Sequence, residues 1–94
     1  MRIVWLRGAL RSLVEEAAYV ARADRRAAVV VVARIRASVE CLTAHPQSGR
    51  AGRVPGTREL VVTGTPYVVP YRVVGDTVQV LRVFHAKRRW PAQL

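Results

Sequence analysis

Apolar residues recur with helical spacing in the first half of the chain and with strand-like alternation in the second. Between Ala9 and Ala23 they return at steps of three and four, as on one face of an amphipathic helix. The same spacing runs from Arg25 to Ala44, behind Asp24, whose carboxylate can accept hydrogen bonds from the free amides of a first turn. The pattern therefore predicts two consecutive helices.

The second of these segments also carries a signal for a strand. The four consecutive valines 29–32 are β-branched, and such residues prefer strands. The length of the segment favours a helix, and Arg36 and Glu40 are spaced to form an i,i+4 pair on its polar side. Pro46 disfavours helical geometry at the preceding residue and ends the run.

The remaining apolar segments predict strands. Gly75 and Asp76 are typical of a tight hairpin turn, and Pro70 inside the run before them indicates a bulge or an edge, because proline gives the ladder no donor. The predicted strands are Ile3–Leu6, Arg58–Thr63, Tyr67–Val74 and Thr77–His85. The order strand, helix, helix, strand, strand, strand predicts an α+β fold, in which a two-helix hairpin covers one face of a mostly antiparallel sheet. Gln47–Gly56, rich in glycine and arginine, is interpreted as a basic loop.

Length and composition narrow the class of protein. Ninety-four residues allow one small domain, 1–94, and a hydrophobic content of 51% is typical of a globular chain. No apolar run approaches the roughly 18 uncharged residues that span a bilayer, and the first residues are too charged for a secretory signal. The single Cys41, interpreted as a small buried apolar group, excludes an internal disulfide and fits a reducing cytoplasm. We expect a soluble cytoplasmic protein without a membrane partner.

The charge of the chain points to an anionic partner. Sixteen basic residues stand against six acidic ones, a net charge of +10, and fifteen of the sixteen are arginine. The basic residues of the loop and Arg58 lie before the last strands, and those of the tail, Ala86–Leu94, lie after them. If the two groups converge, they form one positive patch that holds either phosphates, with Trp90 or Tyr71 stacking on a base, or the acidic side chains of a protein. The alternative is a set of separate, solvated charges. The candidate binding residues are Arg50, Arg53, Arg58, Lys87, Arg88, Arg89 and Trp90.

Four segments of the second half, in this order, resemble the RelE/ParE superfamily of bacterial toxins. They are Pro46 followed by Gly49–Arg50, then Gly56–Leu60, Thr65–Val73 and Val80–Pro91, and the two predicted helices match as well. The resemblance implies the toxin of a type II toxin–antitoxin module, with growth inhibition and plasmid stabilisation as its expected roles. It also implies a hetero-oligomer with a cognate antitoxin, whose C-terminal segment is expected to wrap the helices and sheet. The apolar helix stripes otherwise predict core.

The family offers two targets on one scaffold, so the choice depends on side chains. RelE-like members cleave messenger RNA on the ribosome, which needs a base, an acid and cations at one phosphate. The candidates for this chemistry are His85 as base or acid, Glu59 as an alternative base, and Arg82 among the cations. In a regular strand Arg82 and His85 point to opposite faces, so they meet only if the strand ends or bulges near Phe84.

ParE-like members inhibit DNA gyrase without cleaving RNA, and one stretch favours this mode. RelE-like nucleases commonly carry an arginine early in the middle hairpin strand, where this chain has the apolar residues 67–70. We therefore expect gyrase inhibition by protein binding, with the ribosome-dependent nuclease as the alternative. A toxin that has degenerated and binds only its antitoxin is a third possibility. Two histidines and one cysteine without ligand-like spacing predict no metal site, and we expect no cofactor.

Overall fold

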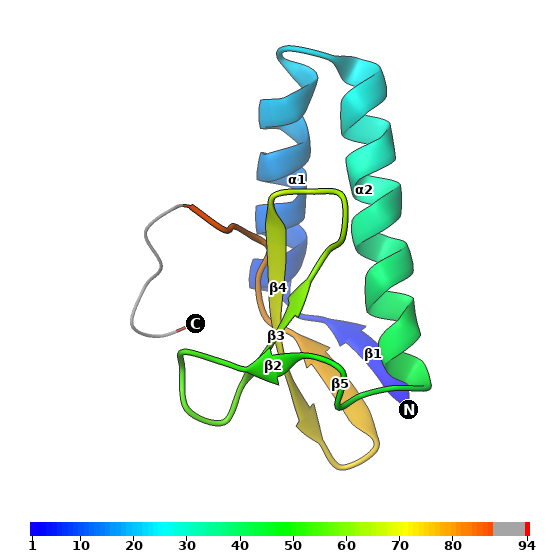
Figure 1. Cartoon of the computed structure of the whole chain (residues 1–94), viewed down its shortest axis with the longest axis vertical. Helices are drawn as coiled ribbons and strands as arrows, with labels where there is room; N and C mark the ends of the chain where they lie inside the picture. The colour runs from blue at the N-terminus through cyan, green and yellow to red at the C-terminus, as the bar shows by residue number, and fades with distance from the viewer. Residues whose placement is uncertain (88–93) are drawn as a thin grey trace.

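A computed structural model describes residues 1–87 and 94 of the chain. A strand, two helices and a series of strands follow one another, which confirms the predicted α+β fold (Figure 1). The elements are β1 (Arg2–Trp5), α1 (Arg7–Ala21), α2 (Arg25–Glu40), the 3-10 turn η1 (Cys41–Thr43), β2 (Arg50–Ala51), β3 (Arg58–Val61), β4 (Tyr67–Val74), β5 (Thr77–Val80) and β6 (Phe84–His85). Within the described residues, no helix combines the length and the apolar character needed to cross a membrane.

Asp24 caps the second helix, as its position before the apolar pattern predicts. Its Oδ1 accepts hydrogen bonds from the backbone N–H groups of Arg26, at 2.9 Å, and Ala27, at 3.2 Å. Two of the amides that a first helical turn leaves without partners are thereby satisfied. Arg36 and Glu40 lie on α2 as expected but form no ion pair with each other, so the cap and the packing of α2 stabilise it instead.

The strands form one mixed sheet in the order β1-β5-β4-β3-β2, and β6 pairs with the first residues of β4. β1 runs parallel to β5, and every other pair is antiparallel. Gly75 and Asp76 join β4 to β5, and Gly75 has a φ of +60°, which glycine adopts without steric cost. The helices lie side by side, and their far ends extend beyond the end of β4 (Figure 1).

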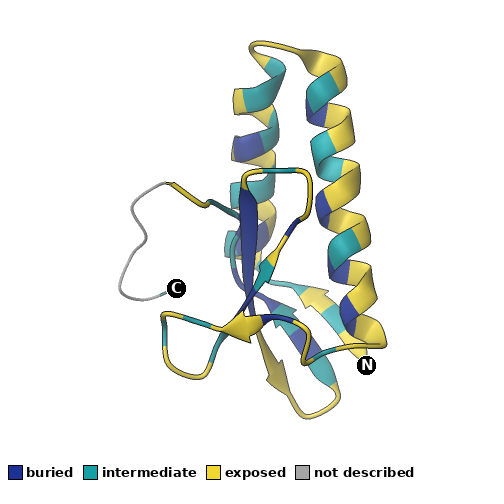
Figure 2. Cartoon of the chain, viewed as in Figure 1, coloured by how far each residue is buried: buried dark blue, intermediate teal, exposed yellow. Residues whose placement is uncertain are grey.

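The core lies between the helix hairpin and one face of the sheet. Val69 of β4 and Val80 of β5 belong to one buried cluster with Ile35 and Val39 of α2. β4 is buried along its first five residues and exposed at its last three (Figure 2). Side chains alternate along a strand, so the even-numbered residues of β4 lie on the opposite side of the sheet, here called the outer face.

The last predicted strand, Thr77–His85, is interrupted, and Pro70 lies opposite the interruption. The N–H of Leu81 donates to the carbonyl of Pro70 at 3.0 Å, but proline has no N–H to donate in return. The register differs by one residue on either side, so residues 81–83 stand opposite two residues of β4. This arrangement is a β-bulge, one of the two outcomes that Pro70 indicated, and it divides the predicted strand into β5 and β6.

Two further expectations need correction. Gln47–Gly56 is not wholly irregular, because Arg50 and Ala51 form β2 and pair with β3. Cys41 is exposed rather than buried, since it follows the last residue of α2 and the next side chain, Leu42, enters the core in its place. The glycines around residues 50 and 51 leave no strand-like alternation that would have revealed β2. In η1 the side chain that enters the core is Leu42, one residue after the cysteine that was expected to be buried.

Candidate functional site

Glu59 brings together two of the predicted binding arginines. Its side chain is 3% exposed, and its Oε1 lies 3.2 Å from Arg50 Nη2 while its Oε2 lies 3.1 Å from Arg53 Nε. The backbone N–H of Arg53 also donates to Oε2, at 2.8 Å. Arg50 is in reach because β2 pairs it directly with Glu59 on the outer face. Both carboxylate oxygens therefore accept hydrogen bonds, and one negative charge offsets part of the charge of two arginines.

The same contacts set the protonation of Glu59. Burial by itself raises the pKa of this carboxyl group, because it penalises the charged form. The hydrogen bonds from the backbone and side chain of Arg53 and from Arg50 favour the carboxylate, and they outweigh burial, so the pKa is lowered below its ordinary value of 4.5. Glu59 is thus a charged, fully engaged group at neutral pH.

Arg58 turns away from this cluster. It pairs with Tyr71, whose side chain packs in the core, so it lies on the helix-side face of β3 rather than on the outer face. Its Nη1 donates to the carbonyl of Gly49 at 2.8 Å and to that of Gln47 at 3.3 Å. The buried hydroxyl of Tyr71 donates to the carbonyl of Pro46 at 2.7 Å and accepts from Gly49 N at 2.9 Å. Together Arg58 and Tyr71 fasten the segment after the helices to the sheet.

Because of the bulge, His85 lies on the same side of the sheet as Val80. The strand therefore bulges near Phe84, which is the condition under which the side chains of Arg82 and His85 were expected to meet. The two side chains nevertheless point to different places. Arg82 donates to the carbonyl of Leu81 at 3.1 Å, and its guanidinium fills the space beside Gly8, where a Cβ would overlap it. The ring of His85 meets the ring of Tyr67 edge-on, 5.7 Å between centroids, and its Nδ1 accepts from Lys87 N at 3.2 Å. Neither side chain hydrogen-bonds to the other.

Lys87 lies beyond the first residue of β4, whereas the Glu59 cluster is level with the middle of this strand. The preceding N–H, of Ala86, donates to the carbonyl of Pro66 at 2.7 Å, which puts Lys87 beside the turn before β4, whereas Glu59 is level with Pro70. Arg88, Arg89 and Trp90 lie outside the described residues. The structure thus brings Arg50 and Arg53 together and holds Arg58 and Lys87 elsewhere.

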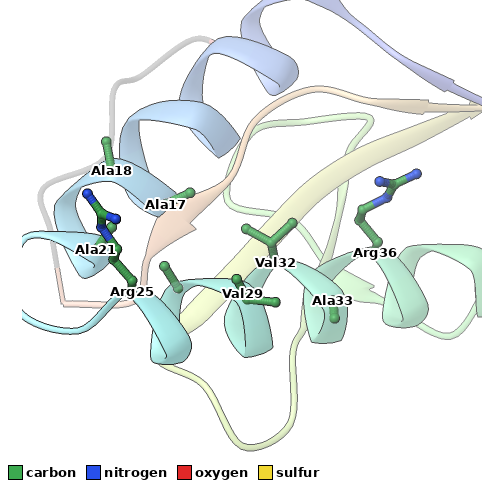
Figure 3. A pocket seen from close by; sticks show the side chains of 9 residues that line it. Ala17, Ala18, Ala21, Arg25, Val29, Val32, Ala33 and Arg36 are labelled. Atoms are coloured by element: carbon green, nitrogen blue, oxygen red, sulfur yellow. The ribbon is translucent and has the colours of Figure 1, made fainter.

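The helices form an apolar groove that the sequence did not locate (Figure 3). Its volume is about 670 Å³, and small apolar side chains make up most of its lining. These are Ala17, Ala18, Ala21, Ala28, Val29, Val32 and Ala33. Arg25 and Arg36 lie toward opposite ends of it (Figure 3). The alanines of the groove lie next to the apolar residues that face the core. Their helical spacing assigns them to the core as well, so the sequence alone does not reveal the groove.

The groove has the chemistry of a helix-binding surface. An open apolar channel between two helices is an energetic liability in water unless a partner covers it. The two arginines are eleven residues apart, which corresponds to about 16 Å along a helix at 1.5 Å per residue. An amphipathic helix with an apolar face and acidic side chains at that separation would fit both features. Metal chemistry has no corresponding site, since no three histidine, cysteine or carboxylate side chains gather within residues 1–87 and 94.

Comparison with known proteins places this fold in a family. The model of the ParE toxin of type II toxin–antitoxin systems (parDE) matches residues 3–90. The chain therefore belongs to the ParE toxin family, in agreement with the resemblance of its second half to RelE/ParE toxins.

Relatives and a solved structure are similar over almost the whole length. The protein Y4kP of Sinorhizobium fredii is 48% identical over 99% of this chain and 96% of its own length. Toxin RelE2 of Caulobacter vibrioides is 32% identical over 93% of this chain and 97% of its own. A chain of the chromosomal ParDE toxin–antitoxin system of P. aeruginosa superposes with a TM-score of 0.80 and 32% identity, covering 90% of this chain and 95% of that one. The names of these proteins include both RelE and ParDE, so they do not distinguish the two targets.

Proposed function

We propose that this toxin acts by binding DNA gyrase and that a cognate antitoxin neutralises it. The observation that carries the proposal is the separation of the three nuclease candidates. Glu59 is held by two arginines on the outer face, Arg82 lies against the start of α1, and His85 packs on Tyr67.

Cleavage of RNA requires these groups to act on one phosphate. The base must reach the 2′-hydroxyl, the acid the departing 5′-oxygen, and the cation the crowded phosphorane between them, each within hydrogen-bond distance. Glu59 has both oxygens occupied, and its lowered pKa makes it a weaker base. Inhibition by protein contact needs no such constellation, and the described side chains support this simpler mode.

For the antitoxin, the groove between α1 and α2 is the proposed docking site. Its occupant in this proposal is an amphipathic helical segment of the antitoxin, with small or apolar residues on one face and carboxylates at the ends. The support is charge complementarity with Arg25 and Arg36 together with the apolar lining between them. A chain of net charge +10 also favours an acidic partner.

The target is tested with purified toxin in a gyrase supercoiling reaction and in a ribosome-programmed translation reaction. We expect supercoiling to stop while messenger RNA stays intact, and His85→Ala and Arg82→Ala to inhibit gyrase as wild type does. Nuclease action instead predicts RNA cleavage that these substitutions reduce by about 10²-fold or more. That result would reverse the proposal, and a chain that binds antitoxin while leaving both reactions untouched would contradict it as well.

The docking site is tested by filling the groove. Ala18→Trp and Ala33→Trp put bulk into an exposed channel, so we expect them to weaken antitoxin binding by about 100-fold while the fold is kept. The matched control is Ala37→Trp, also exposed on α2 but outside the groove lining. For charge, Arg25→Glu is compared with Arg26→Glu, its exposed neighbour outside the groove. Equal effects of the groove variants and their controls would refute the site.

A further inference from the structure

The outer face of the sheet has features of a second docking surface, separate from the groove. It carries Arg72 in the middle of its central strands, beside Gln79 of β5. Val4, Val61 and Val74 lie on the same face by strand alternation and are 37%, 52% and 52% exposed. Val4 is level with Arg72 and Val74 lies two residues along from it, whereas Val61 lies beside the buried Val68, further along the sheet. Exposed valines on a sheet face are unusual, because strands normally turn polar residues to water.

A hollow opens on this face next to Arg72. Its volume is about 440 Å³, and it lies between the 54–57 loop and the strands. Leu6, Val54, Arg72, Val74, Leu81 and Leu94 contribute to its lining. Its lining is mixed, because the guanidinium of Arg72 and the side chain of Thr57 stand among apolar side chains. A pocket of this mixed composition can receive an anchor side chain of a protein partner.

The guanidinium of Arg72 forms no ion pair with a carboxylate of residues 1–87 and 94. Its Nε donates to Gln79 Oε1 at 2.7 Å, and this neutral amide orients the guanidinium without offsetting its charge. Arg50 and Arg53 lie on the same face, where both contact the carboxylate of Glu59. The outer face is thus positive and apolar together.

We propose that the outer face, centred on Arg72, is the surface through which the toxin binds its target, and that it receives an acidic and apolar protein segment. The exposed valines favour a protein over RNA, since valine offers neither a stacking surface nor a donor to a nucleotide but packs well against apolar side chains. This inference rests on the proposed function, because it names the surface that would contact gyrase.

The position of this face separates it from the antitoxin groove. Tyr71 and Val69 of β4 point toward the helices, and Arg72 between Tyr71 and Val73 points away from them. The groove belongs to the helix layer, so a segment seated there leaves the outer face accessible. One toxin molecule can then hold a groove occupant and a target protein at once.

The test measures equilibrium binding of the full-length toxin to purified gyrase holoenzyme. We expect Arg72→Glu to weaken binding at least about tenfold, because a like charge replaces the guanidinium facing an acidic segment. Arg72→Lys should keep much of the affinity for gyrase. Val74→Asp, like Arg72→Glu, should lose affinity. Arg11→Glu, the same charge change on an exposed residue of α1, is the matched control. Antitoxin affinity of each variant reports whether the fold survives.

The outcomes separate the two proposals. Failure of the wild-type toxin to bind gyrase contradicts the proposed function itself. Wild-type binding that Arg72→Glu leaves unchanged, or that Arg11→Glu weakens equally, overturns the assignment of the outer face. Loss of binding to ribosomal or messenger RNA in Arg72→Glu, with gyrase binding unaffected, would overturn the choice of a protein partner.

Discussion

Glu59 connects the edge strand β2 and Arg53 to β3 through its carboxylate. A carboxylate that is almost fully buried is costly unless every lone pair is engaged, and here Arg50 and Arg53 supply donors to both oxygens. These contacts in turn fix the positions of the two arginine side chains on the outer face. A residue that the sequence offered as a general base thus acts in the fold as a support for its neighbours.

Replacing this carboxylate tests its structural role. Glu59→Gln keeps the shape but turns an amide NH₂ toward the arginine donors, so we expect the free energy of unfolding in urea to fall by about 2 kcal/mol. Glu15→Gln, an exposed carboxylate on α1, is the control and should change stability by less than about 0.5 kcal/mol. Equal and small effects of both substitutions would contradict the structural role.

The lowered pKa of Glu59 makes part of the stability depend on pH. A carboxyl group whose pKa is lower in the folded than in the unfolded chain stabilises the fold above its ordinary value of 4.5, and this stabilisation disappears as the pH falls through the lower value. We expect the stability gap between wild type and Glu59→Gln to be constant near neutrality and to close below pH 4.5. Urea unfolding of both proteins across this range measures the gap, and a gap independent of pH would exclude the linkage.

At the scale of elements, the helices and the interrupted last strand show what local sequence can and cannot determine. Asp24 and the helical spacing are local signals, and the helix they predict forms in spite of four valines. The last predicted strand is divided opposite Pro70, a residue of β4. The position of the bulge follows from how β5 and β6 pair with β4, which the sequence of the last strand does not show. β2 is likewise defined by its partner, since two residues among glycines carry no period.

The placement of the candidate site follows the same logic. The sequence predicted that Arg50, Arg53 and Arg58 belong to one basic segment, but strand alternation sends Arg58 to the side opposite Arg50. Arg72 escaped notice because a single arginine in an apolar strand has no local signature. Its neighbours on the outer face come from strands far apart in the sequence, which a linear pattern does not reveal.

The cap of α2 can be measured directly. Asp24→Ala removes the acceptor of two backbone amides, so we expect a loss of about 1 kcal/mol in unfolding free energy, whereas Asp24→Asn keeps an acceptor and should cost much less. Thermal unfolding followed by circular dichroism compares the two. An unchanged unfolding free energy in Asp24→Ala would mean that the cap does not contribute, and that packing alone starts the helix at this point.

For the whole molecule, the two candidate surfaces lie in different layers. The groove belongs to the helix hairpin, and the hollow beside Arg72 lies on the far side of the sheet. An antitoxin that blocks the target surface must therefore pass around an edge of the sheet. An antitoxin segment could then bind the toxin through the groove without preventing the toxin from binding gyrase.

A shortened antitoxin segment examines this consequence. A segment that fills the groove but ends before the sheet edge should bind the toxin with groove-dependent affinity and leave gyrase inhibition largely intact. The full antitoxin should restore supercoiling in the same reaction. The two-surface account is contradicted if the short segment restores supercoiling as efficiently as the full antitoxin at equal occupancy of the toxin.

The most direct measurement follows DNA topology and messenger RNA in one culture after the toxin is expressed without its antitoxin. Plasmid topoisomers and transcript 5′ ends are sampled from the same flask as growth stops. Inhibition of gyrase by protein contact predicts that plasmids relax first while transcripts keep their ends, and that the double variant Arg82→Ala/His85→Ala behaves alike. Transcripts cut within reading frames before any change in topoisomers, with cutting lost in the double variant, would contradict this mechanism.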